Sequence, residues 1–74
     1  MNKESAMEIT LLFRKAAEEL PEKSGEYICC INGEWFITNY SAKHKAFNVF
    51  DNWSLPDVIK NRIHVTYWAE LPKL

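Results

Sequence analysis

Two adjacent cysteines, Cys29 and Cys30, are the residues of this 74-residue chain that are best suited to chemistry. A cysteine nucleophile needs a lowered thiol pKa and a basic partner, and either histidine, His44 or His64, could supply the base. Adjacent strand residues point to opposite faces, so the two thiols cannot bind one metal as a spaced Cys-x-x-Cys pair does. We expect reduced, buried thiols that pack as small hydrophobic side chains, and a cysteine-dependent enzyme is a remote alternative.

Other catalytic patterns are missing from the sequence. His64 stands in an alternating segment beside Thr66, which is typical of a half-exposed strand residue. The acidic residues are scattered, and no pair has a spacing that would place two carboxylates over one substrate. The only glycines, Gly25 and Gly33, both have explanations as turn residues, so there is no phosphate-binding loop. The sequence therefore predicts a protein that is not an enzyme and that needs no cofactor or metal.

One short cluster combines basic and aromatic residues, as platforms for single-stranded nucleic acid do. Lys43 and Lys45 lie close to Tyr40, and these three residues are the candidate nucleic-acid contacts. The formal net charge of the chain is −1, however, which gives no extended positive field for a phosphate backbone. We expect a solvated loop here, and a nucleic-acid-binding accessory protein is the alternative function.

The Asn32-Gly33 pair predicts the hairpin that must position the cysteines. Asn-Gly tolerates the positive φ angles of a two-residue type I′ turn, which places strands at residues 26–31 and 34–40. The turn fixes the register, so Cys30 pairs with Trp35. One face then carries Ile28, Cys30, Trp35 and Ile37. The other face carries Tyr27, Cys29, Ile31, Phe36 and Thr38.

A helix is expected before the hairpin and shorter elements after it. Ser5 and Glu8 have the form of a capping box, and apolar residues then recur at spacings of three and four, which predicts a helix over about residues 6–19. Residues 46–50 and 62–68 show strand patterns. Ser54 and Asp57 repeat the capping pattern, which predicts a short helical turn at residues 55–60.

These elements predict a single small α+β domain over residues 1–74, in which the N-terminal helix packs on an antiparallel sheet of three or four strands. One helix can cover only one face of the sheet, and both faces of the hairpin are apolar. The candidate interaction surface is therefore the hairpin face away from the helix, with Tyr27, Ile31 and Phe36, together with Trp53 in the long connector. The preferred hypothesis is a non-enzymatic interaction module that binds another protein or a second copy of itself.

The apolar run from Ile9 to Phe13 is too short for a signal peptide or a membrane span, which favours a cytoplasmic protein.

The segments ELPEKSGEYICC and VTYWAELP resemble the two ends of a small phage and prophage family of unknown function. The matching residues are Phe13, Leu20, Pro21, Gly25, Tyr27, Val65, Thr66, Trp68, Leu71 and Pro72. The chain departs from the family pattern at Phe13, where the family has Trp, at Tyr67, where it has His, and at residues 69–70, where it has Met-Pro. The resemblance implies a bacterial host cytosol and a closing tryptophan that anchors the sheet, but it brings no established function.

Overall fold

The Asn32-Gly33 turn organises the centre of the fold. In the computed structural model, which describes residues 11–72, the turn joins strand β2 (Gly25–Ile31) to strand β3 (Glu34–Ser41). Both turn residues have positive φ, 52° for Asn32 and 82° for Gly33, as a type I′ turn requires. The predicted hairpin is confirmed.

The predicted register is confirmed as well. Ile31 pairs with Glu34 beside the turn, and the pairing continues without a slip to the other end of the hairpin. The intermediate pairs are Cys30 with Trp35, Cys29 with Phe36, Ile28 with Ile37 and Tyr27 with Thr38. The turn sets the register, and because the pairing contains no bulge, the side chains that share a face are those that the turn predicts.

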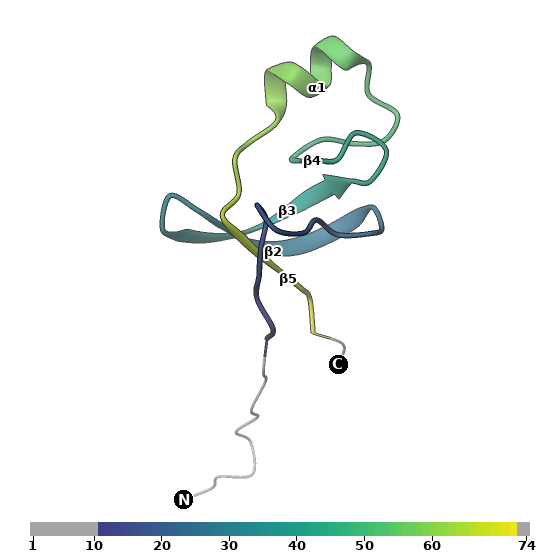
Figure 1. The fold of residues 1–74 in the computed structure, drawn as a ribbon. Coiled ribbons are helices and arrows are strands. Elements are labelled where there is room, and N and C mark those ends of the chain that lie inside the picture. Colours follow the sequence, from purple (N-terminus) through teal and green to yellow (C-terminus); the bar gives the residue numbers. More distant parts are fainter. Residues whose placement is uncertain (1–10, 73–74) are drawn as a thin grey trace, which may run out of the picture.

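Three short strands extend the hairpin into a five-stranded antiparallel sheet in the order β1-β5-β2-β3-β4 (Figure 1). They are β1 (Arg14–Lys15), β4 (Ala46–Phe47) and β5 (Tyr67–Glu70). β5 lies along β2 on one side of the hairpin, and β4 pairs with the end of β3 on the other. Between β4 and β5 the chain thus passes from one edge of the sheet to the far side of the hairpin, where β5 lies between β2 and β1.

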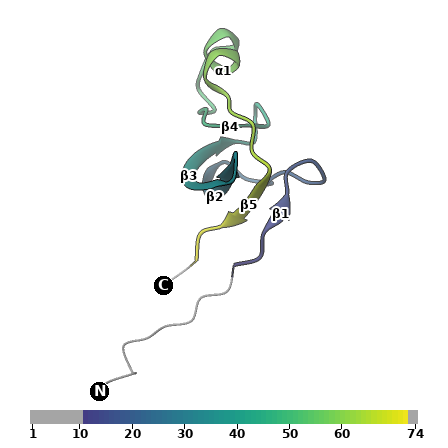
Figure 2. The ribbon, with the colours of Figure 1, turned by 90° about the vertical axis from the view of Figure 1, so that its left-hand side faces the viewer.

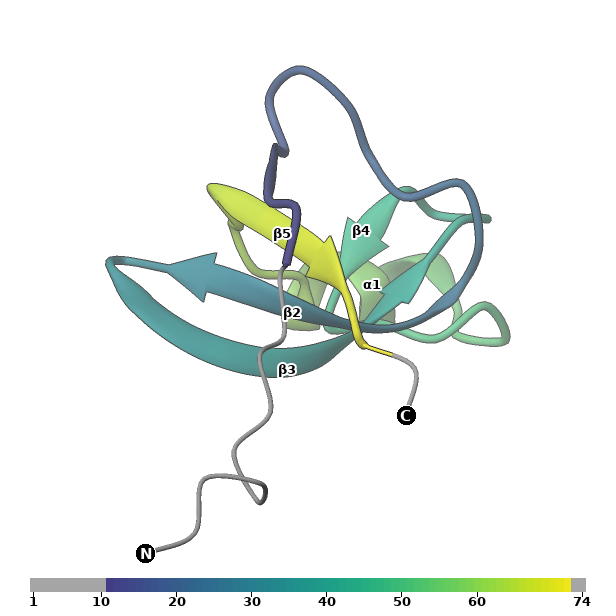
Figure 3. The ribbon, with the colours of Figure 1, turned by 90° about the horizontal axis from the view of Figure 1, so that it is seen from below.

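The sheet curls into a half-barrel. An isolated bridge joins Phe47 of β4 to Ile63, in the segment that leads into β5, and brings the two sides of the sheet toward each other. The side and bottom views show the curvature, with β5 beside β2 of the hairpin (Figures 2 and 3). The helix α1 (Leu55–Asn61) lies beside β4, away from the free end of the hairpin (Figure 1).

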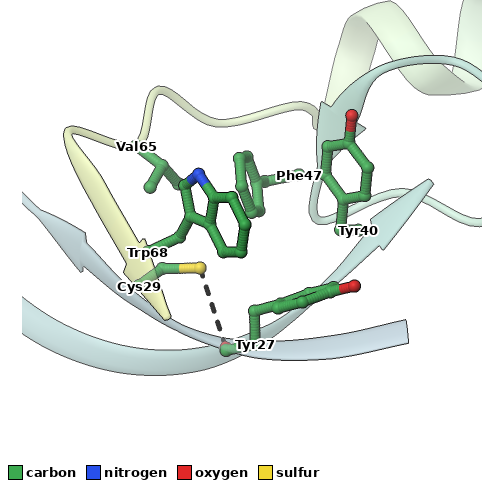
Figure 4. Packing of buried hydrophobic residues seen from close by; sticks show 6 residues of the cluster. All are labelled: Tyr27, Cys29, Tyr40, Phe47, Val65 and Trp68. Atoms are coloured by element: carbon green, nitrogen blue, oxygen red, sulfur yellow. Dashed lines mark hydrogen bonds between the residues drawn. The ribbon is translucent and has the colours of Figure 1, made fainter. Parts of the chain in front are cut away.

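The hydrophobic core fills the concave side of this half-barrel (Figure 4). Its buried residues are Tyr27, Cys29, Tyr40, Phe47, Val65 and Trp68. Tyr27 packs edge-on against both Trp68 and Tyr40, with ring centroids 5.4 and 6.1 Å apart. The indole N–H of Trp68 donates to the backbone oxygen of Glu19 at 2.9 Å, so the loop after β1 is held over the core.

The predicted fold class is wrong, because the described residues form a mainly antiparallel half-barrel without an N-terminal helix. Within residues 11–19 the chain forms β1 instead, where Arg14 pairs with Trp68, and the amide of Ala16 donates to the oxygen of Thr66. Residues 6–10 and the expected capping box lie outside the described residues. The apolar spacing of this segment is compatible with a helix, but pairing with β5 outweighs that weak local preference.

The elements after the hairpin are of the predicted types, but the two strands are shorter than predicted. The predicted strand at 46–50 ends at Phe47, because Asn48 adopts a φ of 67° that turns the chain away from the sheet. The predicted strand at 62–68 is reduced to the bridge at Ile63, and regular pairing begins only at Tyr67. The short helix is confirmed as α1, with Ser54 at its N-cap position.

Candidate functional site: the outer face of the hairpin

The convex side of the sheet carries a second set of apolar residues, which we call the outer face. Alternation along the paired strands places these residues on the side opposite the core. The outer face consists of Phe13, Ile28, Trp35, Ile37 and Tyr67. Trp35 is 56%, Ile37 61% and Tyr67 40% exposed, whereas core residues of the same strands are buried. Contiguous exposed apolar residues of this kind mark contact surfaces more often than isolated ones do.

An aromatic contact across the strands organises the outer face. The rings of Phe13 and Trp35 lie 4.7 Å apart between centroids, although Phe13 precedes β1 and Trp35 is on β3. The smaller residues Cys30 and Ala69 share this face and are buried. We attribute their burial to the two large rings, which extend over the strands between them. The two rings thus connect strand β3 with the segment before β1 across the outer face.

The outer face is bordered by polar groups of both signs. By the same alternation, Lys15 of β1 and Glu26 of β2 lie on this side of the sheet, and both are exposed. An apolar centre with a charged rim is the usual composition of a protein–protein interface.

The residues predicted as an interaction surface do not lie together on one exposed face. Tyr27 is 8% exposed and belongs to the core, and Ile31 packs against the core from its edge. Phe36 shares their face but is exposed, because the free end of the hairpin extends beyond the core. Trp53 lies in the connector before α1, where its ring stacks on Phe50 at 5.4 Å. The face that we expected to be uncovered is therefore covered by β4 and β5, and the opposite face is exposed.

The candidate nucleic-acid contacts are also separated. Tyr40 is 2% exposed and cannot stack on a base, while Lys43 and Lys45 are exposed in the turn between β3 and β4. Lys45, with φ at 52°, instead lines a groove of about 490 Å³ together with Arg62 and His64. The floor of the groove is apolar and includes Phe47, Ile63 and Val65. This basic groove was not evident from the sequence, because its residues come from segments that are distant along the chain.

The cysteines have the environment of packing residues. Both thiols are free and buried, and Cys29 lies fully within the core. Burial raises the pKa of the Cys29 thiol to about 11, so the thiol is protonated at neutral pH and is a poor nucleophile. Its Sγ lies 3.7 Å from the backbone oxygen of Tyr27, as a weak donor would (Figure 4). These properties support the interpretation of Cys29 as a small hydrophobic residue.

A serine, a histidine and an aspartate do meet at one place, beside the end of β3. The Ser41 hydroxyl donates to the Asp51 carboxylate and accepts the backbone N–H of His44 at 3.1 Å. The Ser24 hydroxyl donates to the same carboxylate at 2.8 Å and accepts the amide of Ala42. We call Ser24, Ser41, His44 and Asp51 the Asp51 network.

The geometry of the Asp51 network is structural rather than catalytic. The His44 ring faces the backbone oxygen of Asp51, with Nε2 at 3.2 Å, so Nε2 donates and does not accept a proton from a serine. Hydrogen bonds from Ser41 and then Ser24 hold the pKa of the Asp51 carboxyl below its ordinary value. Sequence reasoning missed this network, because nothing local to Ser24 or Ser41 indicates a partner at residue 51.

Within residues 11–72, no group of three or more His, Cys, Asp and Glu side chains is arranged to hold a metal ion. In the described part of the chain, no helix is long and apolar enough to cross a membrane. Comparisons of the chain with protein-family models, with curated proteins and with solved structures found no match.

Proposed function

We propose that this protein is a non-enzymatic interaction module that binds an apolar segment of another polypeptide through the outer face. The observation that carries the proposal is the exposure of Trp35, Ile37 and Tyr67 on one face of a sheet whose other side is already filled by the core. Tryptophan and tyrosine contribute most to binding at interfaces, and the Phe13–Trp35 contact holds one of them in place before binding.

The main hydrophobic core lies on the side of the sheet opposite the outer face. The core is closed on the concave side by β4, β5 and the loop after β1. An exposed tryptophan that contributes little to folding costs solubility, so its presence favours a role in contact with a partner.

The test uses the photo-reactive amino acid benzoylphenylalanine at position 67 and, as a matched control, at position 59 on α1. Tyr67 is 40% and Ile59 57% exposed, so the control is at least as accessible. We expect a discrete protein adduct in host cells from position 67 only. The captured protein, once purified, should bind the unmodified chain and lose affinity for the double variant Phe13→Ser/Tyr67→Lys. Adducts of equal yield at both positions, or binding that the double variant retains, would contradict the proposal.

A second candidate function is the binding of single-stranded nucleic acid, which one observation favours. Lys45, Arg62 and His64 line a single groove, and no acidic side chain of the described residues lines it. The variant Lys45→Glu/Arg62→Glu should abolish salt-dependent binding of oligonucleotides, whereas the control Lys23→Glu/Lys60→Glu should retain it. Absence of binding by the natural chain at low salt removes this candidate.

The resemblance to the phage and prophage family stays a prediction, and with it the bacterial cytoplasm as the place of action. It is compatible with either candidate function, because the family brings no established activity.

A further inference from the structure

Among residues 11–72, the half of β3 next to the turn has a free edge on the side away from β2. β4 pairs only with Tyr40 and Ser41, at the far end of β3. The amide of Asn48 then caps Asn39 by donating to its backbone oxygen at 2.6 Å. Along residues 34–38, no other strand among residues 11–72 pairs with the side of β3 away from β2. In the bottom view this part of β3 is the outermost strand of the sheet (Figure 3).

The backbone groups of Trp35 and Ile37 point out from this edge. The oxygen of Cys30 accepts the amide of Thr66 and so faces β5, which makes Cys30 and Trp35 a pair without mutual hydrogen bonds. Alternate residues of β3 therefore direct their N–H and C=O groups away from β2. The outward oxygen of Asn39, which Asn48 caps, follows the same alternation.

This edge lacks the features that usually protect an exposed strand. Natural edges are blunted by lysine, proline, bulges or short length. Residues 34–38 contain none of these, and Trp35, Phe36 and Ile37 are all exposed. Glu34, next to the turn, is the only charged residue of the stretch. An extended edge strand with outward backbone N–H and C=O groups, and with apolar side chains on both faces, can pair with a further strand.

We propose that the free edge pairs with the same edge of a second copy of this chain, in an antiparallel arrangement with a two-fold axis at Phe36. This inference goes beyond the proposed function, because it concerns the edge of β3 rather than the outer face, and it stands or falls independently. Trp35 of each copy then lies opposite Ile37 of the other, so the two residues with outward backbone groups exchange hydrogen bonds in both directions. Phe36 faces its own counterpart at the axis, on the concave side of the joined sheet.

The sequence of the edge favours a second copy over an unrelated strand. The two-fold register makes Trp35 and Ile37 a cross-strand pair of an aromatic and a β-branched residue, which is a favourable combination. It places Glu34 opposite Thr38, so no like charges meet. Shifting the register by one residue would align outward backbone groups with inward ones. The same pairing joins the two outer faces into one continuous apolar surface.

The test exploits the symmetry at Phe36, where one substitution acts twice. We expect the natural chain to be a dimer by analytical ultracentrifugation. Phe36→Lys and Phe36→Glu should each weaken association by at least about tenfold, because like charges then meet at the axis. An equimolar mixture of the two variants should form the heterodimer, since opposite charges are brought together. Phe36 is 47% exposed, so both variants should fold, which circular dichroism checks.

The possible results separate this inference from the proposed function. A natural chain that stays monomeric at millimolar concentration, or a mixture of the two variants that does not associate, would overturn the edge pairing. A dimer that survives Phe36→Lys but dissociates in Phe13→Ser/Tyr67→Lys would also overturn it, while supporting the outer face as a contact surface. Edge pairing that persists in Phe13→Ser/Tyr67→Lys, with no adduct from position 67, would support this inference and contradict the wider role of the outer face.

Discussion

The two halves of β3 differ although they belong to one continuous strand. In the half away from the turn, Tyr40 and Ser41 are buried. There β4 pairs with the edge of β3 that faces away from β2, and the Ser41 hydroxyl donates to Asp51 of the Asp51 network. In the half next to the turn, Trp35 and Ile37 are exposed, and no further strand of the described part of the chain pairs with the edge. A strand is thus used for folding at one end and left available for contact at the other.

The difference follows from what lies opposite each half. Tyr40 meets Phe47 with ring centroids 4.7 Å apart and Tyr27 from β2, so its ring is enclosed by aromatic neighbours. Trp35 has one aromatic neighbour, Phe13, on the convex side, where the described residues provide no further layer. Two large aromatic side chains on one strand thus differ in burial, because only the concave side of the half-barrel forms an interior.

The largest expected effect is on folding, from Tyr40→Ala. Removing a buried aromatic side chain leaves a cavity and should lower the free energy of unfolding by about 3–5 kcal/mol. The matched change in the other half, Trp35→Ala, should cost about 1 kcal/mol or less, because the side chain is already largely in water. Urea unfolding at low protein concentration measures both. Similar losses for the two variants would mean that the halves of β3 do not differ in their contribution to the fold.

An intermediate effect is expected from Asp51→Asn, with a defined pH dependence. The pKa of the Asp51 carboxyl is lowered in the folded state, so its stabilising effect is complete above the ordinary value of 3.8 and is lost as the pH falls through the lowered pKa. The variant should therefore be less stable than the natural chain near neutral pH, and the gap should close in acid. Thermal unfolding from pH 7 to pH 2 measures the gap. A gap that does not change with pH would show that the charge of Asp51 is irrelevant.

The smallest expected effect is that of Ile37→Thr. The substitution keeps a β-branched residue at a position that is 61% exposed, so the free energy of unfolding should change by about 0.5 kcal/mol or less. The control is Val65→Thr, which also replaces a β-branched apolar residue by threonine but at a buried position. It should lower the free energy of unfolding more than Ile37→Thr does, because it places a hydroxyl in the core. Urea unfolding compares the two. A large loss from Ile37→Thr would place that residue in the fold rather than in a contact surface.

The parts of the structure that depend on local chemistry were predictable from the sequence. Asn32-Gly33 fixed the hairpin and its register, and Ser54 with Asp57 indicated α1. At the start of α1 the Ser54 hydroxyl donates to the Asp57 carboxylate at 2.8 Å and not to a backbone amide. The sequence thus predicted where the helix begins but not the hydrogen bond that Ser54 makes there.

The parts that depend on distant pairing were not predictable. Both faces of the hairpin are apolar, so the sequence could not show which one becomes the interior. That choice is made when Phe47, Val65 and Trp68 from later in the chain pack beside Cys29. The expected N-terminal helix failed for the same reason, since Arg14 finds a strand partner in β5 that no local pattern reveals.

Amide hydrogen exchange along β3, followed by NMR at increasing protein concentration, tests the central claim most directly. In dilute solution the amides of Trp35 and Ile37 should exchange rapidly, because they point away from β2, while those of Phe36 and Thr38 should be protected within the hairpin. At high concentration Trp35 and Ile37 should become protected as two edges pair. Protection of Trp35 and Ile37 that is already complete in dilute solution, or that never changes with concentration, would contradict the account.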